Sequence, residues 1–162
     1  ILLFLGMFTA SLIGKFEETL SQKAILAVFI PLIGGMAGNT GTQALAVAVR
    51  GIATGDLENE SKWKLIIREA GTGLITGSIC GILITVIIFF WQHDLLLGLL
   101  VGISIFFTLI IATLAGSLIP LVMHKMNIDP AVASGPFITT INDIISILIY
   151  FGLATMFMSY LL

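Results

Sequence analysis

Long apolar runs separated by short polar segments are the feature that most constrains how this chain can fold. Of its 162 residues, 58% are hydrophobic and only 10% are charged, whereas soluble domains are about 45–50% apolar and about 25% charged. Most charged residues lie between the apolar runs. Because about 20 apolar residues span a bilayer as a helix, the sequence predicts an all-α polytopic membrane protein. It excludes a soluble domain, a disordered chain and a nucleic-acid-binding protein.

Five apolar segments predict five transmembrane helices in a single membrane domain covering residues 1–162. The expected spans are 1–14 (a partial span), 24–49, 70–91, 95–122 and 130–160. Residues 50–69 form a polar loop, and its second half, from Glu60 on, is expected to form a short interfacial helix with Trp63 at the headgroups. Because the chain opens inside an apolar run, without an initiator Met or a charged leader, we expect further protein upstream of Ile1.

The distribution of Lys and Arg among the loops predicts the orientation in the cell membrane. With five spans, one side carries Arg50, Lys62, Lys64, Arg68 and Lys125, whereas the other side carries Lys15 and Lys23. Short loops rich in Lys and Arg remain in the cytoplasm. The loop 50–69 and the N-terminus are therefore expected in the cytoplasm, and the C-terminus outside.

Asp143 is the acidic residue placed well inside an apolar span. An aspartate at the bilayer centre costs about 2.5–3.5 kcal/mol, and no basic residue within a span can pair with it. Thr139 and Ser146 share its helix face, and Thr140 and Asn142 lie beside them. We interpret Asp143 as a cation ligand on a wet path, and the alternative is a protonated or hydrogen-bonded structural aspartate.

Two prolines mark the beginning of this last span. Asp129 is expected to cap the helix, with Pro130 at the first helical position. Pro136 would leave the carbonyl of Val132 without its helical partner. Residues 134–136 are therefore predicted to be a distorted helical stretch that lines a cavity.

The second span is unusually rich in glycine and amide side chains. Its sequence PLIGGMAGNTGTQ occupies residues 31–43, and helical spacing produces two neighbouring stripes. One stripe is Gly34, Gly38 and Thr42, and the other is Gly35, Asn39 and Gln43. Glycines admit a close approach by an ion or a helix, and the amides offer neutral oxygens. We interpret both stripes as lining an ion path, while a polar seam between helices is an alternative that can hold at the same time.

These candidate ligands are all oxygen atoms, because no His or Cys lies in the two candidate stripes and Cys80 reads as a small packing residue. Oxygen ligands favour a hard cation over zinc or copper. One carboxylate on a wide path suits Mg²⁺ that keeps part or all of its water shell. Two chains related by a two-fold axis could present two Asp143 carboxylates to one ion. Elsewhere, Gly73, Gly77 and Gly81 predict close helix packing.

Several motifs together resemble the MgtE magnesium channel family. They are PLIGGMAGNTGTQ (31–43), RGIATGD (50–56), DPA (129–131), SGP (134–136) and the TT pair at 139–140 with Asp143. The resemblance implies a homodimer with a pore on the two-fold axis, lined by the second and fifth helices, in which Asp143 binds hydrated Mg²⁺ and Asn39 lines the pore. It also implies an upstream cytosolic region with CBS domains that close the pore when Mg²⁺ is abundant.

Four functions can be compared with these features. The leading one is a non-enzymatic channel for Mg²⁺, with Co²⁺, Mn²⁺ and Ca²⁺ as possible further ions, driven by the membrane potential. The first alternative is an exchanger that couples Mg²⁺ to Na⁺ or H⁺. An intramembrane aspartyl protease needs two carboxylates that share a proton, and one chain supplies a single one. A purely structural anchor leaves the Asp143 and Asn39 clusters unexplained.

Overall fold

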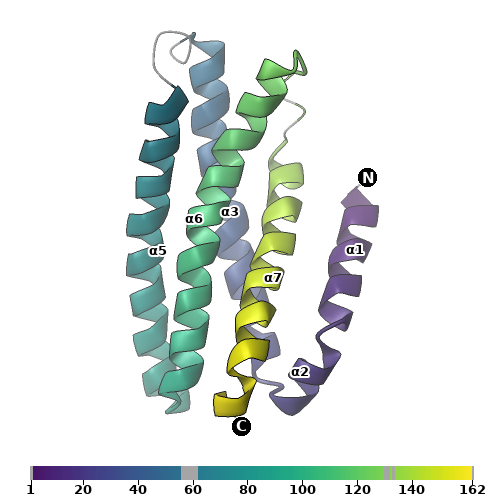
Figure 1. Cartoon of the computed structure of the whole chain (residues 1–162), viewed down its shortest axis with the longest axis vertical. Coiled ribbons are helices and arrows are strands. Elements are labelled where there is room, and N and C mark those ends of the chain that lie inside the picture. Colours follow the sequence, from purple (N-terminus) through teal and green to yellow (C-terminus); the bar gives the residue numbers. More distant parts are fainter. Residues whose placement is uncertain (1, 56–61, 130–131, 133, 162) are drawn as a thin grey trace.

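The protein is a bundle of helices, seen in a computed structural model that describes residues 2–55, 62–129, 132 and 134–161. The helices are α1 (Leu2–Gly14), α2 (Glu17–Gln22), α3 (Leu26–Ala53), α5 (Lys62–Gln92), α6 (Leu95–Lys125) and α7 (Gly135–Leu161) (Figure 1). The four longest run roughly along the same axis, and α1 and the short α2 lie at one edge. The prediction of an all-α protein is confirmed.

Helix α6 is the central element of the bundle. It packs against α5 on one side and against α3 and α7 on the other, while α1 and α2 pack on α7. Helices α5 and α1 therefore occupy opposite edges (Figure 1). The main apolar core joins α3, α5, α6 and α7, with Phe29, Ile88, Val101, Ile105 and Phe151 almost fully buried in it.

Three helices of the described part of the chain are long and apolar enough to cross a membrane. They are Trp63–Gln92, Leu95–Lys125 and Gly135–Phe157. The 28 residues of α3 would extend about 42 Å at 1.5 Å per residue, but the glycines and amides of residues 34–43 make this helix less apolar. Helix α1 has only 13 residues. Three of the five predicted spans thus correspond to helices of sufficient length and apolar character.

Two expected helix boundaries are wrong. The predicted interfacial helix from Glu60 on is not separate: residues 56–61 lie outside the described part, and from Lys62 the chain forms the first turns of α5. The last helix begins at Gly135, so Asp129 does not cap it, and Pro130 lies outside the described residues.

The start of α7 also changes the role of its proline. Pro136 is the second residue of the helix, where a missing N–H costs nothing because first-turn amides have no helical partner. The first regular bond of the helix is donated by the amide of Ile138 to the carbonyl of Ser134, at 3.0 Å. The predicted distortion at residues 134–136 is therefore an ordinary helix start.

Glycines set the distance between α5 and α6. A Cβ added to Gly77 would lie 2.9 Å from the carbonyl oxygen of Phe106, and one added to Gly81 would lie 2.7 Å from that of Gly102. A Cβ on Gly73 would meet the Cα of Ile110 at 2.8 Å. Real side chains do not tolerate such contacts, so the two backbones touch only because these residues are glycine. The predicted packing ladder is confirmed.

Candidate ion-binding site

A cavity of about 360 Å³ lies between α1, α3 and α7 and contains the Asp143 side chain. Its lining residues are Thr9 and Ile13 of α1, Ile30, Pro31, Gly34, Gly35, Gly38 and Asn39 of α3, and Thr139, Asp143, Ser146 and Ile147 of α7. The cavity thus combines one carboxylate with hydroxyl and amide side chains. These groups suit a hard cation or its water shell.

The Asp143 carboxylate lies against the backbone of α3 at Gly34. A Cβ added to Gly34 would be 3.1 Å from Oδ1 of Asp143 and 3.8 Å from Oγ of Ser146. The carboxylate therefore packs so closely on the α3 backbone that an added methyl group would make it move by a few tenths of an ångström. The ion pairs found in the described part of the chain are Lys23–Asp94 and Arg68–Glu69, so no basic side chain there neutralises Asp143.

Two hydroxyl groups beside Asp143 have their protons engaged within α7. The Ser146 hydroxyl donates to the backbone carbonyl of Asp143 at 2.8 Å, and the Thr139 hydroxyl donates to the carbonyl of Gly135 at 2.9 Å. A hydroxyl oxygen whose proton is committed still has lone pairs that can accept a hydrogen bond. Both hydroxyls can therefore act as acceptors for a cation or for the water around it.

The α3 wall has a closed part and an open part. Gly38 faces Thr139, whose Cγ2 would lie 2.8 Å from an added Cβ. Nothing lies within 4 Å of a Cβ added to Gly35, and the side chain of Asn39 is exposed. The stripe containing Gly34 and Gly38 thus meets α7, while the stripe containing Gly35 and Asn39 faces open space.

Other residues expected on the ion path do not line this cavity. Asn142 is buried, with 1% of its surface exposed, and contacts α3 instead. The Thr42 hydroxyl bonds to the Gly38 carbonyl at 2.7 Å, and the Thr140 hydroxyl bonds to the Pro136 carbonyl at 2.8 Å. Gln43 and Pro136 are exposed. One face of α7 cannot present both Asn142 and Asp143, because consecutive residues are about 100° apart on a helix.

The contribution of α1 was not anticipated from the sequence. Thr9 and Ile13 form the wall of the cavity on the side of α1. Thr9 is one of two hydroxyl residues in an apolar segment, the other being Ser11, and its proton is donated to the carbonyl of Leu5 at 3.0 Å. Such a residue resembles any back-bonded threonine of a membrane helix, so no sequence signal marks it.

Within the described residues, no three His, Cys, Asp or Glu side chains come together as a metal cluster. Asp143 is the carboxylate among the lining residues of the cavity. Mg²⁺ commonly binds through one or two carboxylates while it keeps several waters. The cavity can therefore serve a hydrated ion, with water molecules between the cation and most of the protein oxygens.

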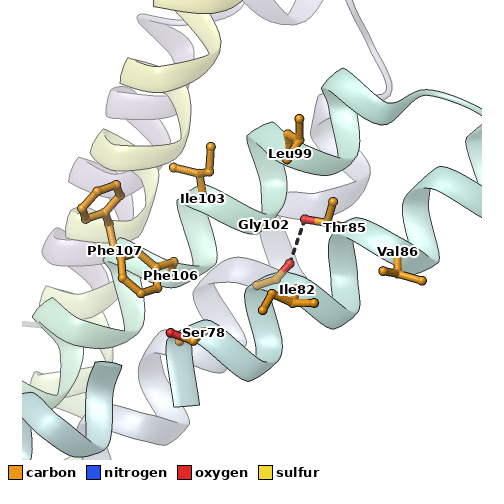
Figure 2. Close-up of a pocket in the computed structure, with 11 residues that line it drawn as sticks. Ser78, Ile82, Thr85, Val86, Leu99, Gly102, Ile103, Phe106 and Phe107 are labelled. Atoms are coloured by element: carbon orange, nitrogen blue, oxygen red, sulfur yellow. Dashed lines mark hydrogen bonds between the residues drawn. The ribbon is translucent and has the colours of Figure 1, made fainter. Parts of the chain in front are cut away.

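A second hollow, of about 530 Å³, lies between α5 and α6 and has a different character. Its walls are mainly apolar side chains, among them Ile82, Val86, Ile103 and Phe107 (Figure 2). The Thr85 hydroxyl is engaged with the Gly81 carbonyl at 2.8 Å and the Gly98 carbonyl at 3.0 Å. None of the residues that line this groove carries a carboxylate.

Sequence comparisons show which known proteins the chain resembles. The family model for MgtE, described as a divalent cation transporter, matches residues 30–153. The chain is 54% identical over 159 residues to a magnesium transporter MgtE of Enterococcus faecalis, and the match covers 98% of the chain and 35% of that protein. It is 48% identical over 157 residues to the Bacillus subtilis transporter of the same name, with coverages of 97% and 35%.

A Thermus thermophilus magnesium transporter MgtE is 33% identical over 154 residues, covering 95% of the chain and 34% of that protein. The chain thus spans about a third of the length of these relatives. The matched region includes α5, α6 and most of α3 and α7, and so contains the α3 and α7 walls of the Asp143 cavity. The chain belongs to the MgtE family of divalent cation transporters.

Proposed function

We propose that this chain is the membrane part of a Mg²⁺ channel and that Asp143 is its ion-binding carboxylate. The observation that carries the proposal is the position of this carboxylate in a cavity shared by α3 and α7, among hydroxyl and amide oxygens. The identity of the ion is inferred from the three relatives, which are all called magnesium transporters. A divalent cation that enters the cell gains about 4.6 kcal/mol per 100 mV, so no further energy source is required.

We further propose that the working form is a homodimer with five transmembrane helices per chain. One chain brings a single carboxylate to the cavity, while a two-fold axis beside α3 and α7 would bring two. Two carboxylates would match the charge of Mg²⁺. In this arrangement the loop 50–69 and the N-terminus lie in the cytoplasm and the C-terminus lies outside, as the distribution of basic residues predicts.

The decisive test is Asp143→Asn in the full-length protein that contains this segment. The change removes the charge at nearly constant shape, so Mg²⁺ flux into proteoliposomes should fall at least tenfold. Glu17→Gln is the matched control, because Glu17 is exposed on α2 and outside the cavity. Flux equal to that of the unmodified protein in Asp143→Asn would overturn the site.

The same proteoliposomes distinguish a channel from an exchanger. A channel passes Mg²⁺ under an imposed membrane potential with no Na⁺ or pH gradient. An exchanger stops when both gradients are absent. Flux that disappears without Na⁺ or a pH gradient would therefore reject the channel and support the alternative that uses the same cavity.

A further inference from the structure

Asn142 is a buried polar residue that does not line the Asp143 cavity. Only 1% of its surface is exposed, and its Nδ2 donates a hydrogen bond to the backbone carbonyl of Ala37 on α3, at 3.3 Å. Its Oδ1 is buried and has no hydrogen-bond partner among the residues that the structure describes. Burying an amide oxygen without a hydrogen-bond partner costs free energy of folding. A role for this contact would explain why the cost is tolerated.

The contact depends on a glycine of α3. A Cβ added to Gly41 would collide with Nδ2 of Asn142, and it would also lie 3.2 Å from the carbonyl oxygen of Ala112 on α6. The amide thus fills the space between three helices where a side chain on α3 would otherwise lie. Asn142 thus contacts α3 at both Ala37 and Gly41.

This contact lies at the same level as the cavity. Ala37 is three residues after Gly34, which meets Asp143, and one residue before Gly38, which meets Thr139. Asn142 itself precedes Asp143 in α7. A shift of α3 at Ala37 would therefore change the separation between the Gly34 backbone and the Asp143 carboxylate, which sets the width of the cavity.

We infer that Asn142 is a positioning residue for ion binding: its amide clamps α3 to α7 and so fixes the distance between Gly34 and the Asp143 carboxylate. This inference rests on the proposed function of the Asp143 cavity. It predicts an effect on the apparent Mg²⁺ affinity, which a purely structural hydrogen bond far from the cavity would not alter.

The test compares Asn142→Ala with Tyr150→Phe in the full-length protein. Tyr150 is a matched control, because it is also buried on α7 and its hydroxyl also donates to a carbonyl of α3, that of Leu26, at 3.0 Å. It does not line the cavity. Flux into proteoliposomes is measured over a range of Mg²⁺ concentrations, and thermal unfolding is followed in detergent.

Both variants should unfold at lower temperature. Asn142→Ala should raise the half-saturating Mg²⁺ concentration about 5-fold, the equivalent of one ordinary hydrogen bond, whereas Tyr150→Phe should leave it unchanged. Unchanged half-saturation in Asn142→Ala, or an equal change in both variants, would overturn the inference. Asp143→Asn, run in parallel, reports separately on the proposed function.

A second pair of variants tests the same contact from α3. Gly41→Ala should displace the Asn142 amide and raise the half-saturating concentration in the same direction. In the double variant with Asn142→Ala, the new methyl group occupies vacated space, so the effect should be smaller than the sum of the two single effects. Additive effects would show that the two residues act independently, which contradicts the clamp. Asn142→Ser is the milder replacement if Asn142→Ala does not fold.

Discussion

Gly34 and Gly35 are neighbours on α3, and both line the cavity, yet the structure predicts opposite results for a single added methyl group. At Gly34 the new Cβ would lie 3.1 Å from Oδ1 of Asp143, closer than ordinary van der Waals contact. At Gly35 it would have no neighbour within 4 Å. In both variants, replacing glycine inside a helix favours folding by about 1 kcal/mol, so any difference between them arises from the cavity.

The size of the difference follows from what the methyl group displaces. In Gly34→Ala an apolar carbon covers one carboxylate oxygen and excludes a water molecule or the ion shell from that side. Losing one hydrogen bond to a charged group costs about 1.5–3 kcal/mol, although part of this is regained if the carboxylate moves aside. We expect the half-saturating Mg²⁺ concentration to rise about tenfold, which corresponds to 1.4 kcal/mol.

The assay is Mg²⁺ flux into proteoliposomes that contain the full-length protein, with thermal unfolding as a check of folding. Gly35→Ala should keep the half-saturation of the unmodified protein and unfold at a slightly higher temperature. The reasoning is refuted if Gly34→Ala binds Mg²⁺ normally. It is equally refuted if both variants lose affinity to the same extent, because the contact at Oδ1 would then not be the cause.

Two further predictions concern the bundle itself. Partial burial raises the pKa of Asp94, but hydrogen bonds from the Leu97 amide and the Lys23 ammonium group outweigh it, so that pKa is lowered in the folded protein. The stabilisation from ionised Asp94 is present above the unfolded pKa of about 4 and is lost as the pH falls through the folded pKa. Asp94→Asn should therefore make the unfolding temperature fall less steeply on acidification. An unchanged pH profile would contradict this prediction. Gly77→Leu should push α5 from α6 and cost about 1–3 kcal/mol in thermal unfolding, whereas Gly71→Leu, which has no neighbour within 4 Å of its Cβ, should cost far less; equal losses would argue against close packing at Gly77.

The sequence alone was sufficient to predict the class of fold and to identify Asp143 and the glycines of α5 as unusual residues. Apolar runs of helical length with almost no charge inside them are stable as helices in a bilayer, because a helix hydrogen-bonds all of its own backbone groups. An aspartate inside such a run is conspicuous because its burial is costly. The glycine ladder of α5 was also predictable, since glycines four residues apart on one face serve close helix contact.

Boundaries were less predictable, and the reason lies in the local chemistry. Proline is favoured within the first turn of a helix, and it also occurs in the interior, where it distorts the helix at a cost in free energy. The sequence around Pro136 therefore fitted both a distorted helix and a helix start. The polar residues from Lys62 to Glu69 likewise fitted either a separate interfacial helix or the first turns of a long one, and α5 adopts the second arrangement.

Helical periodicity determined which residues share a face, but only tertiary packing decided what each face meets. The cost of burying a charge pointed to Asp143 as the residue on the ion path, but the sequence could not show that Asn142, about 100° away on the same helix, is buried against Ala37. Nor could it place Thr9 beside Asp143, because 134 positions separate them in the chain and no local pattern records that α1 packs on α7. Such contacts form only when whole helices pack against one another, and this packing depends on the complementary shapes of entire surfaces rather than on any short segment.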